Sequence, residues 1–188
     1  MGGCFSTPPA MEANRVGATR LSVESKWKVS EWGRSYLTVK DADGNVVYEV
    51  KGSGICNLGY VMSDEDGDKV LEAVISFAGG QKIHIDGGKH TGYTGTTNTN
   101  FMLGMSVLQM SLKSGETFMA VVYKRIGKCR MDLYPGIMST APLDGKGLVA
   151  QLFTVGTISQ KGTMVVTKDC MYEIPCAMLV VMMASNLL

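Results

Sequence analysis

Length, composition and charge restrict the classes of protein to which this chain can belong, before any motif is considered. The chain has 188 residues, with 18 Lys and Arg against 17 Asp and Glu, so its formal net charge at pH 7 is +1. This near balance provides no bulk charge for binding nucleic acid, and one domain of this length can bury a sizeable core. The five cysteines are an odd number without a C-x-x-C pair, which argues against a disulfide framework and favours reduced thiols in an intracellular protein.

The N-terminal stretch MGGCFS fits the pattern M-G-x-x-x-[ST], with Gly2 and Ser6 at its defining positions. This pattern predicts N-myristoylation of Gly2 after removal of Met1. One myristoyl chain binds a membrane with a partition constant of only about 10⁴ M⁻¹, so stable anchoring needs a second signal, which a palmitoyl group on Cys4 would supply. We therefore expect residues 1–14 to be a flexible, acylated leader and residues 15–188 to form one domain. A chance match in an unstructured N-terminus is the alternative.

Short apolar segments separated by turn residues follow along the domain. In the first pair, Leu37 and Val39 alternate with polar residues before the Asp-Gly turn at 41–45. Alternation on both sides of such a turn is a strong hairpin signal. The expected strand pairs are 35–40 with 46–50, 58–62 with 70–75, 118–123 with 129–134, and 148–155 with 163–167, the last of them turning at Gly162. With no helical stretch between them, these pairs predict an antiparallel sheet or barrel.

The polar, Gly-rich segment 79–99 interrupts this pattern, and we expect a strand over 81–86 flanked by loops. His84, Asp86 and His90 would be three ligands of a metal site if this segment belonged to an enzyme, but their arrangement is more typical of a solvated strand edge and loop. The acidic segment 64–68 lacks the Gly and Glu of a calcium-binding EF-hand loop, so we interpret it as a hairpin turn. The sequence thus predicts no metal, no cofactor and no enzymatic activity, and an enzyme with a site in the Gly-rich 79–99 segment is a further alternative.

The C-terminal segment is apolar at every position from Cys176 to Ala184. Pro175 suits the first turn of a helix. A helix that is hydrophobic all round is buried in a protein core or in lipid, and a span across a bilayer takes about 20 apolar residues. We therefore expect a helix buried in the fold, with a membrane tail anchor as the alternative.

Two stretches resemble one protein family. Residues 36–52, YLTVKDADGNVVYEVKG, look like the first hairpin of the tubby C-terminal-like superfamily, and residues 171–183, MYEIPCAMLVVMM, look like its final strand-to-helix segment. The superfamily includes tubby-like proteins, LURP-one-related proteins and phospholipid scramblases, and this chain is most similar in style to the LURP-one-related branch. The resemblance implies a mainly β fold, a closed antiparallel β-barrel of about twelve strands around the buried hydrophobic C-terminal helix. The segment 79–105 departs from the family's pattern.

Basic residues gather at one predicted hairpin end, namely Lys124, Arg125, Lys128 and Arg130. Successive strand residues point to opposite faces, so Lys124 and Arg125 do not face the same site. Beside a membrane, each basic group contributes about 1 kcal/mol of attraction to anionic headgroups, and the resemblance implies a similar role, since tubby-like proteins bind phosphoinositides through basic residues of the barrel. A solvated turn is the alternative.

Together these features predict a membrane-tethered, N-acylated binding or adaptor protein at the cytoplasmic face of a membrane, in particular the plasma membrane. Its expected partners are the membrane, through the acyl groups, and anionic phospholipid. Nucleic acid is not expected, and the sequence does not specify protein partners. Scramblase-like lipid transport is the alternative function, although the C-terminal membrane segment and the cysteine-rich run of scramblases are not evident in this sequence.

Overall fold

The structure is a computed structural model of the chain, and it describes residues 17–28, 34–53, 59–76, 82–87, 94–97, 100–102, 105–136, 147–156, 159–185 and 188. The described residues form thirteen strands and one helix. The elements are β1 (Thr19–Lys28), β2 (Arg34–Lys40), β3 (Val46–Ser53), β4 (Gly59–Ser63), β5 (Lys69–Ser76), β6 (Lys82–Gly87), β7 (Thr94–Thr97), β8 (Asn100–Met102), β9 (Met105–Ser111), β10 (Thr117–Arg125), β11 (Lys128–Pro135), β12 (Ala150–Val155), β13 (Ser159–Val166) and α1 (Glu173–Ala184).

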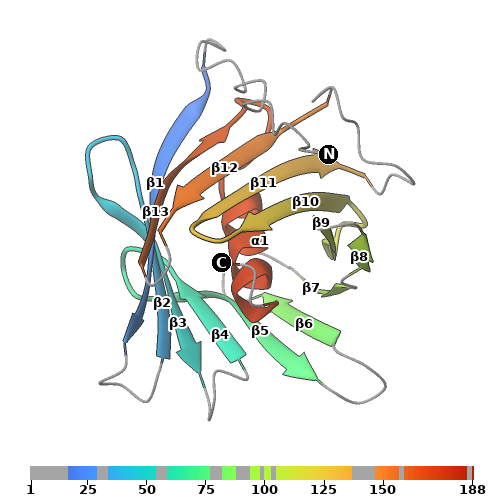
Figure 1. The fold of residues 1–188 in the computed structure, drawn as a ribbon. Coiled ribbons are helices and arrows are strands. Elements are labelled where there is room, and N and C mark those ends of the chain that lie inside the picture. Colours follow the sequence, from blue (N-terminus) through green and yellow to red (C-terminus); the bar gives the residue numbers. More distant parts are fainter. Residues whose placement is uncertain are drawn as a thin grey trace.

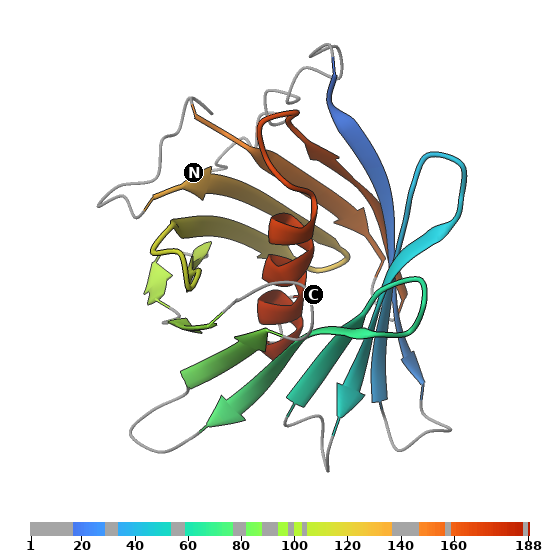
Figure 2. The same cartoon turned by 180° about the vertical axis from the view of Figure 1, so that it is seen from behind.

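All of these strands belong to one antiparallel sheet. Each strand pairs with the next along the chain from β1 to β7 and again from β8 to β13. The first strand, β1, also pairs with the last, β13, and this pairing joins the two halves. Figure 1 and Figure 2 show from opposite sides how the sheet curves around α1. The mainly β, antiparallel architecture with one C-terminal helix, predicted from the alternating segments, is therefore confirmed.

The ends of the strand order, β7 and β8, are the two edges of this curved sheet. Within the described residues, no hydrogen-bonded ladder connects these two strands. Cα atoms of β7 and β9 nevertheless lie within 8 Å of one another. The sheet thus curls until one edge comes close to the other, but the described ladders do not close it into a barrel.

The helix α1 occupies the inside of the curved sheet. Every residue from Ile174 to Ala184 is buried, and the helix lies against β4, β5 and β9. A helix that is apolar around its whole circumference needs apolar partners on all sides. Inward-facing residues from both halves of the sheet provide them, among them Val50, Met110 and Met131. The predicted burial of this helix is confirmed. No helix among the described residues combines the length and the apolar character that crossing a membrane requires.

The acidic turns of the sheet satisfy their own polar groups. In the turn 41–45, the Gly44 amide donates to the Asp41 carbonyl at 3.3 Å, and the Asp41 carboxylate accepts a hydrogen bond from the Asn45 amide at 2.8 Å. Gly44 has a φ of 90°, a left-handed conformation that glycine adopts without strain. In the turn 64–68, the Asp64 carboxylate accepts from the Asp68 amide at 2.9 Å. The interpretation of both segments as hairpin turns is confirmed.

The turn predicted at Gly162 is wrong. Gly162 lies inside β13, where it pairs with Thr154 of β12 and Val23 of β1. A Cβ at this position would lie 2.0 Å from the Phe153 carbonyl oxygen, so the close approach of the two strands explains the glycine. The chain reverses between Val155 and Ser159 instead. The strands β1, β7, β8 and β9 are further elements that the sequence patterns did not predict.

Candidate functional site

The β10–β11 hairpin has an apolar inner face and an outer face of different chemistry. At the inner positions, Val122 pairs with Met131, and both are buried in the core around α1. One residue along, Tyr123 pairs with Arg130 on the outer face, because successive strand residues point to opposite sides. Near the turn the outer side chains are exposed, whereas farther from it Met119, Val121 and Tyr134 belong to a second buried cluster.

The register of four strands brings three basic residues into one transverse row at the end of the hairpin. Arg125 of β10 pairs with Lys128 of β11. Lys128 pairs with Val155 of β12, which in turn pairs with Lys161 of β13. Residues directly opposite in an antiparallel pair share a face, with Cβ atoms about 4.5–5.5 Å apart. We call Arg125, Lys128 and Lys161 the basic row.

One carboxylate lies beside the basic row. Glu24 of β1 is opposite Lys161 in the ladder and contacts its ammonium group at 3.2 Å, and it also contacts Lys26 at 3.1 Å. The hydrogen bond from Lys26, aided by Lys161 and opposed by desolvation, lowers the pKa of Glu24 below its ordinary value. Among the described residues, Glu24 thus lies within ion-pair distance of two lysines, Lys26 and Lys161.

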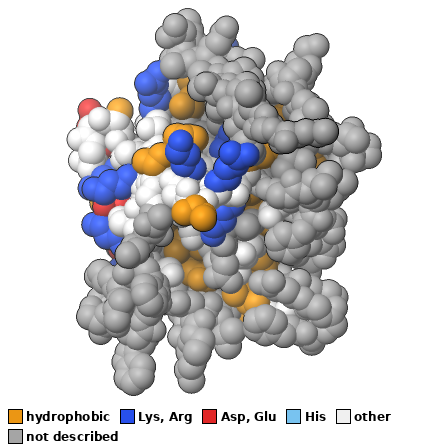
Figure 3. All heavy atoms as spheres, viewed as in Figure 1, with side chains coloured by type: hydrophobic (Ala, Val, Ile, Leu, Met, Phe, Trp, Pro, Cys, Tyr) orange, Lys and Arg blue, Asp and Glu red, His pale blue; other side chains and the backbone are white. Residues whose placement is uncertain are grey.

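Three apolar side chains are exposed among these basic residues. Ile126, at the turn between β10 and β11, is 97% exposed, and Phe153 and Val155 of β12 are 45% and 46% exposed. The Gly156 amide donates to the Gly127 carbonyl at 3.0 Å, which holds the end of β12 against the turn that carries Ile126. Figure 3 shows basic and hydrophobic side chains interspersed over this side of the molecule. The outer surface is therefore cationic and apolar at once.

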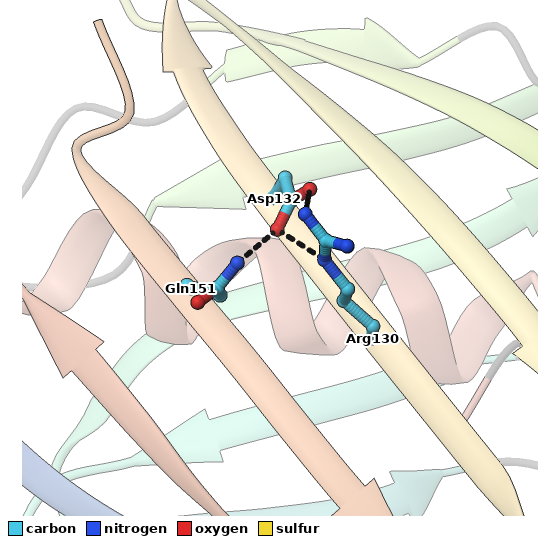
Figure 4. A network of polar contacts seen from close by, with 3 residues as sticks. All are labelled: Arg130, Asp132 and Gln151. Carbon is cyan, nitrogen blue, oxygen red and sulfur yellow. Dashed lines mark hydrogen bonds and ion pairs between the residues drawn. The ribbon is translucent and has the colours of Figure 1, made fainter. Parts of the chain in front are cut away.

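A polar network lies on the same outer face of β11 and β12, farther from the hairpin turn than the basic row (Figure 4). Asp132 is only 1% exposed. Its carboxylate accepts hydrogen bonds from Nε of Arg130 at 2.9 Å and from Nε2 of Gln151 at 2.7 Å. The Arg130 guanidinium lies 5.1 Å from the centre of the Tyr123 ring, a cation–π distance, and the pKa of Tyr123 is raised mainly by burial and further by Asp132. The charge of Arg130 is thus compensated within the protein.

The four basic residues predicted from the sequence lie at one hairpin end without forming a single site. Lys124 pairs with Cys129, a core residue, whereas Arg125 pairs with Lys128 on the outer face. The register confirms that Lys124 and Arg125 face opposite ways. Arg130 shares the outer face but is bound by Asp132, as described above.

Other parts of the site lie beyond the sequence prediction or outside the described residues. Lys161 was missed, because only the pairing of β12 with β13 brings it beside the hairpin. The expected lipidation residues Gly2 and Cys4, and the whole of the 1–14 leader, lie outside the residues that the structure describes.

The Gly-rich segment contributes strands to the sheet. The strand β6 confirms the one expected over 81–86, and both His84 and Asp86 are exposed on it. His90 lies outside the described residues. In the part of the chain that is described, no group of three or more His, Cys, Asp or Glu side chains is placed to hold a metal ion.

Comparison of this chain with protein-family models, with curated proteins and with solved structures finds no match. The outer surface over β10–β13 combines three features that bear on function. They are the basic row, the three exposed apolar side chains, and the buried Asp132 network on the same face.

Proposed function

We propose that this protein is a membrane-tethered binding or adaptor protein that recognises anionic phospholipid headgroups at the cytoplasmic face of the plasma membrane. Acyl groups on Gly2 and Cys4 attach it, and the basic row binds the headgroups. In this proposal the protein is not an enzyme, and its sheet is a closed β-barrel of the tubby C-terminal-like superfamily around α1. The curvature of the sheet around a wholly buried helix supports that fold.

The observation that carries the proposal is the arrangement of like charges. Arg125 and Lys128 lie directly opposite each other in the ladder, so both cations face the same side of the sheet. An anionic headgroup on that side would be attracted by both of them.

The expected attraction is strong enough to change the affinity of the protein for an anionic membrane. Each basic residue near an anionic bilayer contributes about 1 kcal/mol, so Arg125 and Lys128 together contribute about 2 kcal/mol, or a factor of roughly 30 in affinity. One myristoyl chain attaches a protein only marginally, whereas one chain with a polybasic patch attaches it stably. The basic row therefore supplies a second signal for the Gly2 anchor, in addition to Cys4.

Vesicle co-sedimentation of the full chain tests the headgroup interaction, with Gly2→Ala throughout so that acylation cannot contribute. The protein should bind phosphatidylcholine vesicles that contain phosphatidylserine more tightly than vesicles of phosphatidylcholine alone. The affinity should fall with added salt, which shortens the Debye length. Reversing both charges of the pair, Arg125→Glu with Lys128→Glu, should weaken binding by about 100-fold or more.

The matched control is Lys113→Glu, an exposed residue in the turn at the other end of β10. It changes the net charge without touching the basic row, so it should leave binding nearly unchanged. Equal losses from the control and from the charge-reversed pair would refute the proposed site. In cells, Gly2→Ala alone should move the protein from the membrane to the soluble fraction, and an unchanged membrane fraction would refute the tether.

A further inference from the structure

We propose that the end of the β10–β11 hairpin inserts into the lipid interface, with Ile126, Phe153 and Val155 as the inserted side chains. The inference rests on the proposed function, and it deepens that function by naming the residues that enter the bilayer and the side of the protein that faces it. The outer face at the hairpin end then lies against the bilayer, with the basic side chains at the level of the headgroups and the apolar side chains reaching the boundary with the acyl chains.

The conformation of the turn between β10 and β11 does not explain why an isoleucine, Ile126, is at its tip. Two-residue hairpin turns favour Asn-Gly or Asp-Gly, which supply the backbone conformation and polar exposure. The turn between β10 and β11 keeps the glycine, Gly127, with a φ of 71°. It carries an isoleucine before it that is almost fully exposed. The turns 41–45 and 64–68 of the same sheet carry acidic residues instead. A large apolar side chain held in water at a tip is typical of an interaction site.

The exposed side chains on β12 belong to the same surface as the tip. Val155 lies directly opposite Lys128, and Phe153 lies directly opposite Arg130. The hydrogen bond from Gly156 to Gly127 links the end of β12 to the turn. The three apolar side chains are thus carried by two adjoining strand ends, and hydrogen-bonded strands present them without a need for rearrangement.

The charges around these side chains favour a bilayer over other occupants. Arg125 and Lys128 flank Ile126 in the chain, and Val155 lies between Lys128 and Lys161 in the row. Cations bordering apolar side chains match the layers of an anionic membrane, where headgroup phosphates lie above the acyl chains. A second copy of this chain would bring the same cations against one another, which costs free energy at an interface.

Phe153 is the apolar side chain farthest from the tip, and it lies in the row next to the basic row on the same outer face. Arg130, opposite Phe153, binds the buried carboxylate of Asp132 and lies against the ring of Tyr123. Its charge is compensated, so the row that contains Phe153 is close to neutral. The outer face therefore passes from the cationic row at the hairpin end to a neutral, partly aromatic row farther from the tip.

Vesicle binding separates this inference from headgroup attraction alone. The full chain with Gly2→Ala is compared with the same chain carrying Ile126→Ser, or Ser at positions 126, 153 and 155 together, on vesicles of phosphatidylcholine with phosphatidylserine. The single substitution should weaken binding by about tenfold and the triple by about 100-fold, and the losses should persist at high salt, because burial of apolar groups is not screened. Ile126→Leu should bind as the parent does.

The control is Val74→Ser, which removes from β5, in the other half of the sheet, an apolar side chain as exposed as Phe153 and Val155, and it should change nothing. As a second measurement, tryptophan at position 126 should be quenched by phosphatidylcholine brominated on its acyl chains, and tryptophan at position 74 should not be. If the parent binds anionic vesicles but the serine variants match it and position 126 is not quenched, insertion is wrong and the headgroup proposal survives. If the parent binds no vesicles, both proposals fail. If Ile126→Ser abolishes self-association or capture of an acidic peptide while vesicle binding stays intact, the surface belongs to that partner and insertion is overturned.

Discussion

The inner and outer faces of strands β10–β13 differ in the chemistry of their side chains and in what determines it. On the inner face, one transverse row contains Val122, Met131, Leu152 and Met164, all buried in the core cluster that includes α1. On the outer face, the chemistry changes with each row, from the Asp132 network through Arg130 and Phe153 to the basic row. Burial alone accounts for the inner residues, because any polar group there would lose its water. The outer residues at the hairpin end have no such constraint, so their chemistry is better evidence for what the protein contacts.

The largest expected difference between the faces comes from placing one carboxylate on each. Val180→Asp would put a carboxyl group on a helix that is buried along its length. Whether the group is protonated or ionised, it loses its hydration and displaces packed neighbours, and we expect destabilisation of about 4 kcal/mol or more. That is a large part of a domain stability of about 5–15 kcal/mol. A thermal melt of the full chain should show loss of the cooperative transition or a much lower midpoint.

The control for this prediction is Ile126→Asp at the exposed tip. Its carboxylate stays in water, so the stability should change by no more than about 0.5 kcal/mol. A cooperative melt of Val180→Asp near the midpoint of the control would contradict the burial of α1.

Removing a carboxylate from the Asp132 network on the outer face should lower the free energy of unfolding by an intermediate amount. Asp132→Ala removes the carboxylate that binds both Arg130 and Gln151. Breaking a buried ion pair leaves the partner uncompensated, and we expect a loss of about 3 kcal/mol in the free energy of unfolding. Glu49→Ala breaks an exposed pair with Lys51, whose atoms lie 2.7 Å apart, and should cost less than about 1 kcal/mol. Urea denaturation of both variants makes the comparison, and equal losses would show that the Asp132 network contributes no more than a surface pair.

The fold was predictable where alternation and turn chemistry coincide. The pair β2–β3 combines both signals, whereas β4–β5 and β10–β11 are short apolar segments on either side of a turn, and each pair was predicted at nearly its observed bounds. β1 was missed although Leu21 and Val23 alternate with polar residues, because Ser25 interrupts the inward series. Gly162 was misread because a glycine that avoids a clash with the Phe153 carbonyl looks the same in sequence as a glycine that makes a turn.

The candidate site was predictable only as far as neighbours in the chain can reveal it. Arg125 and Lys128 are close in sequence, so the cluster was visible. The pairing of Arg130 with Asp132 was also within reach, because residues two apart in a strand share a face. Lys161 and Phe153 belong to the surface through the register of β11, β12 and β13. No local pattern encodes that register.

Cys129 on the inner face and Glu24 on the outer face have pKa values that are shifted in opposite directions. On the inner face, burial raises the pKa of the Cys129 thiol to about 11. Its thiolate is disfavoured in the fold, so this contribution to stability is present below the ordinary pKa of 9.0 and is lost as the pH rises toward the folded value. On the outer face, Glu24 has a lowered pKa, because Lys26 and Lys161 favour its charged form. Its contribution should therefore be lost in acid.

The Glu24 effect is the smallest and also the most specific test of the outer charges. A lowered folded pKa means that Glu24 stabilises the protein above its ordinary pKa of 4.5, and that the stabilisation disappears as the pH falls through the folded value. Because the side chains of Lys26 and Lys161 are mostly exposed, solvent screens the interaction, and we expect well under about 1 kcal/mol. Urea denaturation of the protein and of Glu24→Gln, at neutral pH and in acid below the folded pKa, measures the difference. The parent should be slightly more stable at neutral pH, the advantage should shrink with salt, and it should vanish in acid. If the parent is more stable than Glu24→Gln by the same amount in acid, Glu24 stabilises the fold through packing and not through its charge interactions with Lys26 and Lys161.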